Sequence, residues 1–415
     1  AVPRSNFADR PAPIARFVRV GRQKNVRLHQ KFVMLIERMQ KDNLQRDLAE
    51  SNKVLVLYGA RQVGKTTLVR EVLKNFSGKV LEINADMVPF LEALSSRNLD
   101  RLSALVRGYD LVFIDEAQRI PDIGINLKIL HDNLPDLKII VTGSSSLDLA
   151  NRVKEPLTGR TWTFHLFPIS AEEWTRHHRA NDVQAELQLE NWMIYGLYPE
   201  LLAIENAEKK NRYLQEITHS YLYKDILTLA NIRYPEKLRQ ILKLLAWQIG
   251  NLVSVNELAN TLQLSRDAVA NYLDLLEKSF VIFRLGGYSR NLRKEVTKMD
   301  KIYFYDLGVR NALIENFNSL STRQDAGQLW ENFLMAERIK NASYRFRYAS
   351  RHFWRTHTGA ELDLVEDSGG HLSGYEFKWG AKIGTAPAAW TDAYPQAGFQ
   401  CINRENFMPF IRAEL

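Results

Sequence analysis

Residues 54–66 read VLVLYGARQVGKT, and this stretch decides the fold of the first half of the chain. Its first five residues form an apolar run of strand length. Residues 59–66 then fit the pattern G-x-x-x-x-G-K-S/T, and residues 67–74 have the composition of a helix. A strand, a glycine-rich loop and a helix in this order are the setting of a phosphate-binding loop. The sequence therefore predicts a nucleotide site here.

Each residue type in the loop has a physical task. Backbone N–H groups of a glycine-rich turn wrap a phosphate, and the helix N-terminus adds positive potential. We expect Lys65 to reach the β- and γ-phosphates and the Thr66 hydroxyl to bind Mg²⁺. The predicted nucleotide-binding residues are Gly59, Ala60, Arg61, Gln62, Val63, Gly64, Lys65, Thr66, Thr67 and Ser144.

A second apolar run, residues 111–114, ends in Asp115 and Glu116, fifty residues after Lys65. In a phosphate-loop enzyme, carboxylates at such a strand end hold Mg²⁺ and polarise the attacking water, and we assign these roles to Asp115 and Glu116. The next apolar run is followed by Ser144, a candidate γ-phosphate sensor. Arg160, or alternatively Arg152, is a candidate for stabilising transition-state charge at its own site or at that of a neighbour. A surface salt bridge would explain either arginine almost as well.

The wider pattern favours an α/β fold. Strand-like runs recur at residues 79–83, 110–114 and 137–142 with helix-like segments between them, which indicates a parallel sheet covered on both faces. Residues 28–48 have helical spacing of apolar side chains. We predict a phosphate-loop domain at 28–168 and a helical subdomain at 169–235.

Residues 236–318 have the order of a winged-helix domain, with helices expected at 236–249, 255–262 and 265–279 and a hairpin formed by 281–284 and 301–305. Basic residues of the hairpin loop would suit a wing that lies on DNA phosphates. They are Arg290, Arg293, Lys294, Lys298 and Lys301. A module of this type also serves as a packing or lid element, so DNA contact stays open.

Four runs, at 57–67, 113–118, 142–145 and 157–160, resemble a family of prokaryotic AAA-type ATPases with a C-terminal domain of unknown function. The resemblance extends from about residue 28 to the end. It implies an ATP-binding domain, a helical and winged-helix middle, and a restriction-endonuclease-like α/β domain, which we place at 319–415. Adenine is expected from this resemblance and because the sequence has no evident guanine-reading Asn-Lys-x-Asp motif.

Two strand-like segments near the C-terminus, residues 361–365 and 375–379, carry Asp363, Glu376 and Lys378. Period-two geometry places Glu376 and Lys378 on one face, and a hairpin brings Asp363 beside Glu376. Two carboxylates and a lysine suit Mg²⁺-dependent phosphodiester cleavage, with Glu331 on a preceding helix as a further ligand of this second Mg²⁺. The arrangement resembles the PD-(D/E)xK nucleases, without their proline. An active nuclease, an inactive binding fold and coincidence stay open.

Charge is concentrated at one end of the 415-residue chain. Residues 1–31 contain eight of the 56 basic residues and one of the 48 acidic residues, so the remainder is nearly neutral. We expect residues 1–27 to be a basic, disordered tail. The single Cys401 excludes an internal disulfide framework, and no apolar run approaches membrane-spanning length. Together with the lack of a signal-peptide pattern, this predicts a cytoplasmic protein without a membrane partner.

Three functional hypotheses follow. The first is a Mg²⁺-dependent ATPase whose nucleotide state controls a DNA-binding or DNA-cleaving C-terminal module. The second is an ATP-dependent switch or scaffold that binds a protein partner through an inactive nuclease-like domain, as the near-neutral charge outside the tail suggests. The third is a nuclease in which ATP is only structural. The sequence leaves the oligomeric state open.

Overall fold

The computed structural model describes residues 36–85, 87–143, 157–222, 234–289, 299–381 and 383–413. Several predicted features lie outside these residues: the basic tail at 1–27, Ser144, Arg152, and the wing residues Arg290, Arg293, Lys294 and Lys298. Among the described helices, none is both long and apolar enough to cross a membrane.

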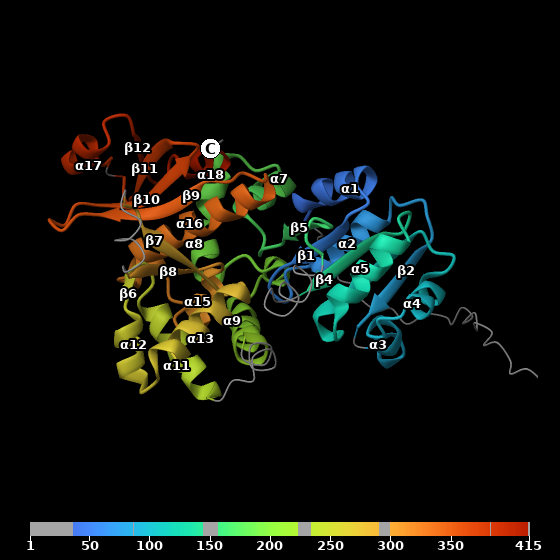
Figure 1. The fold of residues 1–415 in the computed structure, drawn as a ribbon. Coiled ribbons are helices and arrows are strands. Elements are labelled where there is room, and N and C mark those ends of the chain that lie inside the picture. Colours follow the sequence, from blue (N-terminus) through green and yellow to red (C-terminus); the bar gives the residue numbers. More distant parts are fainter. Residues whose placement is uncertain are drawn as a thin grey trace, which may run out of the picture. The chain divides into compact units, whose positions relative to one another are not determined.

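A parallel sheet forms the core of the first part of the chain (Figure 1). Its strands, in the order β2-β3-β4-β1-β5, are β1 (Val54–Tyr58), β2 (Val80–Asn84), β3 (Leu111–Asp115), β4 (Lys138–Gly143) and β5 (Thr161–His165). All neighbouring pairs are parallel. The α/β fold with a parallel sheet is therefore confirmed.

Helices cover both faces of this sheet, and β1 shows why its sequence is apolar throughout. Alternate residues of β1 belong to two separate apolar cores, Leu55 and Leu57 to one and Val54, Val56 and Tyr58 to the other. A strand buried on both faces needs apolar side chains at every position. The first core includes side chains of α1 (Gln40–Glu50) and α2 (Lys65–Leu73), and the second those of α4 (Leu99–Val106) and α5 (Ile123–Asn133). The short α3 (Val88–Leu94) precedes α4.

The first described helix is shorter than its sequence pattern indicated. Helical spacing began at residue 28, but α1 begins at Gln40, and residues 36–39 are not helical. The reason lies in the partners of this segment. The Met39 amide donates to the Glu173 carboxylate at 2.9 Å, and the Arg38 side chain binds groups far away in the sequence. Tertiary contacts fix this segment where local spacing favoured a helix.

Helices dominate residues 171–222. They are α7 (Ala171–His178), α8 (Asp182–Tyr195), the short turn η2 (Pro199–Ala203), α9 (Ala207–Glu216) and the π-helical segment η3 (Ile217–Leu222). Both α7 and α8 begin with a capping box, in which the cap side chain and the third helical residue satisfy each other's backbone N–H groups. These boxes, Ser170 with Glu173 and Asn181 with Gln184, explain where the two helices start.

A second sheet runs through the rest of the chain in the order β12-β11-β10-β9-β7-β8-β6. Its strands are β6 (Leu252–Val253), β7 (Ile282–Gly287), β8 (Asp300–Phe304), β9 (Ser350–Arg355), β10 (Glu361–Ser368), β11 (His371–Phe377) and β12 (Gly398–Ile402). Strands β7 and β9 pair in parallel through Gly286 with His352 and Gly287 with Phe353. The boundary predicted at 318/319 therefore lies between strands of one continuous sheet.

The helices of this region are α11 (Pro235–Trp247), α12 (Val255–Leu262), α13 (Arg266–Lys278), α15 (Leu307–Leu313), the turn η4 (Leu320–Thr322), α16 (Ala326–Tyr344), α17 (Ala388–Ala393) and α18 (Phe407–Arg412). The first three lie close to the predicted ranges. The predicted hairpin is also present, since β7 and β8 pair in antiparallel fashion from Ile282 with Phe304 to Leu285 with Lys301.

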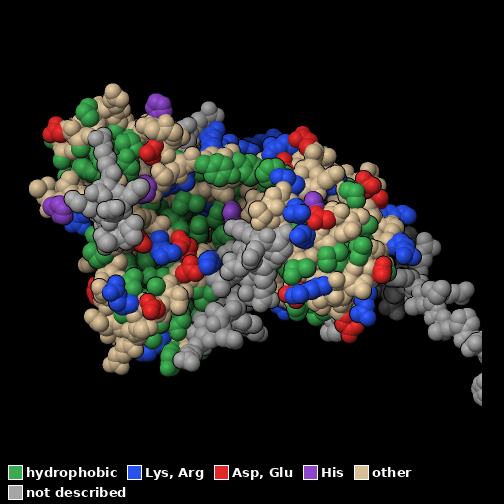
Figure 2. Space-filling model, viewed as in Figure 1, with side chains coloured by type: hydrophobic (Ala, Val, Ile, Leu, Met, Phe, Trp, Pro, Cys, Tyr) green, Lys and Arg blue, Asp and Glu red, His purple; other side chains and the backbone are tan. Residues whose placement is uncertain are grey.

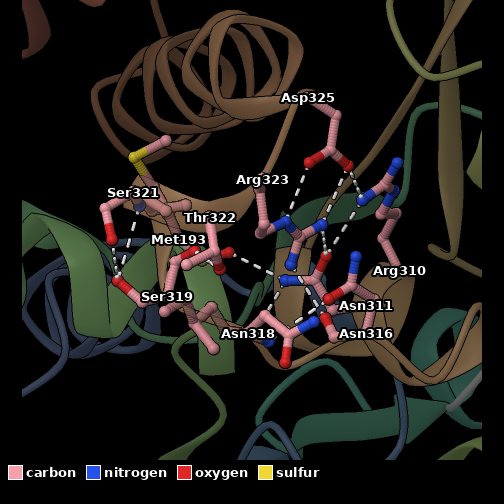
Figure 3. A network of polar contacts seen from close by, with 12 residues as sticks. Met193, Arg310, Asn311, Asn316, Asn318, Ser319, Ser321, Thr322, Arg323 and Asp325 are labelled. Carbon is pink, nitrogen blue, oxygen red and sulfur yellow. Dashed lines mark hydrogen bonds and ion pairs between the residues drawn. The ribbon is translucent and has the colours of Figure 1, made fainter.

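A polar network fastens α15 to its surroundings (Figure 3). Arg310 and Arg323 are both buried and both bind the carboxylate of Asp325, with the closest contacts at 2.6 and 2.8 Å. Arg310 also donates to the Ala246 carbonyl at the end of α11. The neighbouring Asn311 amide donates to two carbonyls at the end of α8. The network thus joins α8, α11, α15 and the start of α16.

Candidate functional site

The phosphate-loop sequence connects the carboxyl end of β1 to the amino end of α2, as predicted. Gly64 caps α2 with φ of +95°, and Gln62 has φ of +62°. A Cβ atom on Gly59 would lie 2.1 Å from the Leu166 carbonyl oxygen, so no other residue fits without moving backbone. The loop needs its first glycine for close backbone approach and its second for a left-handed conformation.

The Lys65 side chain is buried in this loop. Its ammonium donates to the carbonyl oxygens of Gly59 and Ala60, both at 2.9 Å. These two carbonyls belong to the loop's own first turn, so the charge is held where the loop bends. A buried ammonium beside a helix N-terminus makes this a strongly attractive location for an anion.

The ends of three elements meet at Asp115, the last residue of β3. The Thr66 hydroxyl, on the first turn of α2, donates to Oδ2 of Asp115 at 2.8 Å. The Thr142 hydroxyl, on β4, donates to Oδ1 of the same carboxylate and accepts from the Glu116 amide at 3.3 Å. The structure therefore brings the predicted pair Thr66 and Asp115 into contact. A hydroxyl and a carboxylate oxygen at this distance suit a hard divalent cation such as Mg²⁺.

Glu116 follows directly, with φ of +56°, and Oε2 of its carboxylate accepts a hydrogen bond from the Gln118 side-chain amide. A left-handed backbone at a non-glycine residue is uncommon and is found often at functional sites. Thr142 was not among the predicted site residues. Its position as a polar residue at the end of an apolar strand, next to the strand of Asp115, was the available signal.

The structure does not place Arg160 beside this chain's own phosphate loop. Its carbonyl accepts from the Val54 amide at 2.9 Å, which places Arg160 at the amino end of β1. The phosphate loop follows the carboxyl end of that strand, roughly 13 Å away for four residue steps. Its guanidinium instead pairs with Asp132, with N–O distances of 2.7 and 3.1 Å. A role toward a neighbouring copy stays a prediction.

A residue that the sequence did not single out, Arg38, contacts the loop. It is buried, and its Nη1 donates to the Val63 carbonyl at 2.7 Å. No local pattern signals this contact. The two residues come from different segments, Arg38 lies outside the phosphate-loop motif, and Val63 stands at a motif position that any residue type can fill.

The C-terminal acidic residues come together on neighbouring strands. Antiparallel pairing of Leu364 with Tyr375 sets Asp363 opposite Glu376, and the Phe377 amide donates to the Asp363 carboxylate at 2.7 Å. Lys378 forms an ion pair with Glu376 at 2.5 Å. The predicted hairpin and the grouping of these side chains are therefore present.

Lys301 departs from its predicted place. It was expected on a DNA-contacting wing, but it lies on β8 with only 5% of its side chain exposed. Its ammonium is 3.1 Å from Glu331 and 2.6 Å from Glu361, with Asp363 at 4.0 Å. The Tyr303 hydroxyl also donates to Glu331, at 2.5 Å. The wing assignment of Lys301 is wrong, because acidic partners on β10 and α16 bury it.

Burial and mutual repulsion shift the ionisation of this cluster (defined here as Lys301, Glu331, Glu361 and Asp363). Burial and the negative charge of Glu331 raise the pKa of Asp363 to about 7, against the opposing charge of Lys301. Burial would lower the pKa of the Lys301 ammonium, but the surrounding carboxylates outweigh it and raise that pKa. Lys301 therefore stays charged among these acids.

The predicted second Mg²⁺ site at Glu331, Asp363 and Glu376 is not confirmed. Within the described parts of the chain, no three His, Cys, Asp or Glu side chains form a group that could hold a metal ion. The Lys301 ammonium lies 3.1 Å from Glu331 and 4.0 Å from Asp363 and supplies counter-charge to both carboxylates. The second Mg²⁺ site therefore stays a prediction.

Three family models match the chain. An AAA domain matches residues 51–175, a domain of unknown function (DUF8612) matches 186–320, and another domain of unknown function (DUF4143) matches 326–397. The first match includes the phosphate loop and Asp115. It confirms an AAA-type P-loop ATPase domain, and the last confirms a C-terminal domain of unknown function.

The uncharacterized protein Rv2008c of Mycobacterium tuberculosis is 31% identical over 349 residues, which cover 83% of this chain and 74% of that protein. The chain belongs to the family of Rv2008c. Another relative, the uncharacterized protein MJ1544 of Methanocaldococcus jannaschii, is 26% identical over 307 residues, or 69% of this chain and 66% of that protein.

Two solved structures are more distant. The RuvB Holliday junction branch migration motor of Thermotoga maritima is 18% identical with a TM-score of 0.30, over 60% of this chain and 90% of that one. AMPPCP-bound DnaA of Aquifex aeolicus is 16% identical with a TM-score of 0.30, over 61% and 93%. At TM-scores this low, the similarity says nothing about function.

Proposed function

We propose that the protein binds ATP with Mg²⁺ at the phosphate loop and hydrolyses it. The observation that carries this proposal is the contact between Thr66 and Asp115 beside the buried Lys65. These are the residues that hold cation and phosphate in phosphate-loop ATPases, and here they meet at the carboxyl ends of β1 and β3.

Each side chain has a defined task in this proposal. Lys65 exchanges its loop carbonyls for phosphate oxygens, which neutralises charge on the β- and γ-phosphates. Thr66 and Asp115 hold Mg²⁺, which supplies charge stabilisation when bound. Glu116 orients and polarises the attacking water, and Thr142 fixes the Asp115 carboxylate through its hydroxyl. Ser144 remains the proposed γ-phosphate sensor.

Phosphate release with ATP and Mg²⁺ tests the proposal. We expect Glu116→Gln to lower kcat by roughly 10²- to 10⁴-fold while binding of a non-hydrolysable analogue is kept, because the amide keeps the shape but cannot polarise water. Lys65→Ala should lose analogue binding. Glu236→Gln, at an exposed position on α11, is the matched control and should behave as the parent. Parental turnover by Glu116→Gln or Lys65→Ala would contradict the proposal.

For the C-terminal module, we infer a binding role in preference to DNA cleavage. The specific observation is Lys301, whose buried ammonium lies within 4.0 Å of Glu331, Glu361 and Asp363 and supplies the positive charge that a metal ion would otherwise bring to these carboxylates. The partner is then a protein or a nucleic acid that is bound without being cut. Charged residues of both signs are mixed over the face drawn in Figure 2, which suits a switch or scaffold at least as well as a DNA enzyme.

Incubation with supercoiled, linear and single-stranded DNA, with Mg²⁺ or Mn²⁺ and with or without ATP, tests this inference. We expect no cleavage by the parent or by Asp363→Ala. Cleavage by the parent that Asp363→Ala abolishes would establish a nuclease and overturn it. Persistence of that cleavage in Lys65→Ala would further assign ATP a structural role. A salt-dependent shift of DNA by a chain lacking residues 1–27 would identify nucleic acid as the partner.

A further inference from the structure

One face of α16 carries a row of polar side chains that bind the segment running from the end of the parallel sheet into the first turn of α7. Its members are Glu337, Lys340, Asn341, Tyr344 and Arg345, which we call the α16 row. Spacings of three and four residues place them on a single helical face. The segment that they contact, residues 167–172, begins two residues after β5 ends.

Every member of the α16 row has a partner in that segment. The Glu337 carboxylate accepts from the Ala171 amide at 2.6 Å, and Lys340 donates to the Ile169 carbonyl at 3.3 Å. Asn341 and Arg345 each donate to the Glu172 carboxylate at 2.6 Å. The Tyr344 hydroxyl accepts from the Phe167 amide at 3.2 Å. The polar face of α16 therefore binds the segment by which the chain leaves the parallel sheet.

Arg38 extends this row to the phosphate loop. Its guanidinium donates to the Tyr344 hydroxyl at 3.2 Å, to the Phe167 carbonyl at 2.6 Å and to the Glu173 carboxylate at 3.0 Å. The same group donates to the Val63 carbonyl at 2.7 Å. One planar guanidinium makes all four hydrogen bonds. It therefore fixes the phosphate loop, α7 and α16 relative to one another.

The Val63 carbonyl, to which Arg38 donates, belongs to the loop that would bind phosphate. A loop that offers its N–H groups to phosphate has to turn its carbonyl groups outward, and an outward carbonyl needs another donor. Val63 stands between two residues with positive φ, Gln62 and Gly64, so its peptide orientation belongs to the loop's special conformation. Arg38 donates a hydrogen bond to the Val63 carbonyl and so stabilises this peptide orientation.

We propose that Arg38 is a positioning residue that links the phosphate loop to α16, so that nucleotide binding and the order of the C-terminal module are coupled. This inference rests on the proposed binding of ATP. When phosphate fixes the loop, the Val63 carbonyl is held toward Arg38, and the guanidinium in turn is held against Tyr344 and Phe167. Linkage is reciprocal, so a change at Tyr344 alters nucleotide affinity.

The test is Tyr344→Phe, which keeps the ring and removes only the hydroxyl that accepts from Arg38 and Phe167. Tyr348→Phe is the matched control, because Tyr348 lies just beyond α16 with 86% of its surface exposed. Calorimetric titration with a non-hydrolysable ATP analogue and Mg²⁺ should show affinity lowered about five- to tenfold in Tyr344→Phe, and the parental value in Tyr348→Phe.

Hydrogen exchange provides a readout that general loosening of the fold would not reproduce. In the parent, the analogue should slow exchange of peptides that cover residues 337–345, and Tyr344→Phe should lose this response. A parent that binds the analogue with no change in these peptides would overturn the inference and leave the proposed ATP binding intact. So would parental affinity in Tyr344→Phe. A parent that does not bind the analogue would contradict both the inference and the proposed function.

Discussion

At Gly59 the backbone of the phosphate loop passes within contact distance of the segment after β5. The Leu166 carbonyl oxygen would lie 2.1 Å from any Cβ placed there. The Leu166 amide in turn donates to the Tyr58 carbonyl at 2.7 Å, so neither chain segment can withdraw without losing a backbone hydrogen bond. A single hydrogen atom as side chain is therefore a condition for this loop to close.

We predict that Gly59→Ala destabilises the protein by about 2 to 3 kcal/mol, in the range of overpacked buried positions, and weakens nucleotide binding. Urea unfolding measures the first effect and analogue titration the second. Gly327→Ala is the control, because Gly327 lies at the start of α16 with no neighbouring atom within 4 Å of its Cβ position. That substitution should be neutral or slightly stabilising. Equal stability of the two variants would contradict the packing argument.

The residues that sequence reasoning found are those whose chemistry is encoded by local spacing. Lys65 and Thr66 lie inside one short motif, and Asp115 stands at the end of an apolar strand. Arg38 and Lys301 could not be found in this way. The partners of Arg38 are 25 to 306 residues away in the sequence. Lys301 stands near a basic loop and has the sequence setting of a surface residue, and only the fold brings acidic residues of β10 and α16 to it.

For Arg160 the structure favours the alternative of a surface ion pair over a role at this chain's own phosphates. Its nearness in sequence to the nucleotide motifs suggested a site at the phosphates, but sequence distance does not tell which edge of a parallel sheet a residue occupies. In such sheets the loops at the carboxyl ends bind ligands. Arg160 precedes its strand, β5, and so lies at the other edge.

At the level of elements, strand and helix types were predicted well because their patterns are unambiguous. Strand β1 is apolar throughout and is buried on both faces, and α12 and α13 begin at the serine caps that their sequences offer. The start of α1 was missed because Arg38 and Met39 are bound to α7. The continuity of the second sheet was also missed, since the pairing of β7 with β9 involves only two residues of each strand.

The Asp325 network at α15 gives a pH prediction. Burial would raise the pKa of Asp325, but hydrogen bonds from Arg323 and the charge of Arg310 outweigh it and lower that pKa to about 2. A carboxylate with a lowered folded-state pKa contributes stability that is complete above its unfolded pKa of about 4 and is lost as the pH falls from there toward 2. By this linkage the contribution is at most about 2 kcal/mol at neutral pH, and solvent screening at this half-buried carboxylate lowers it.

Urea unfolding of the parent and Asp325→Asn between pH 7 and pH 3 measures this effect. We expect Asp325→Asn to be less stable by about 2 kcal/mol or more at pH 7, with a difference that shrinks below pH 4. Asp274→Asn, which removes an exposed ion pair with Lys278, is the control and should cost less than about 1 kcal/mol at any pH. A pH-independent difference for Asp325→Asn would show that the charge is not what stabilises the network.

Over the whole molecule, the sequence predicted an α/β ATPase domain, a helical subdomain, a winged-helix domain and a nuclease-like C-terminal domain, and the second sheet crosses the boundary between the last two. Family models end near residues 175 and 320, whereas the second sheet runs from β6 to β12 across residue 320. Pattern reasoning recognises each helix and hairpin locally. It cannot see that β9, which comes some sixty residues after β7, takes the place beside it.

The pairing of β7 with β9 also has a consequence during synthesis. At ribosomal rates, roughly 3 to 14 seconds separate the emergence of Gly287 from that of Arg355. Once β8 has been synthesised, β7 has its antiparallel partner on one side and still lacks β9 on the other. An open strand edge is a template for pairing with other nascent chains. Strand β9 later pairs with Gly286 and Gly287, so the part of the β7 edge that waits for it is only two residues long, and these residues have no side chains to strengthen pairing with another chain.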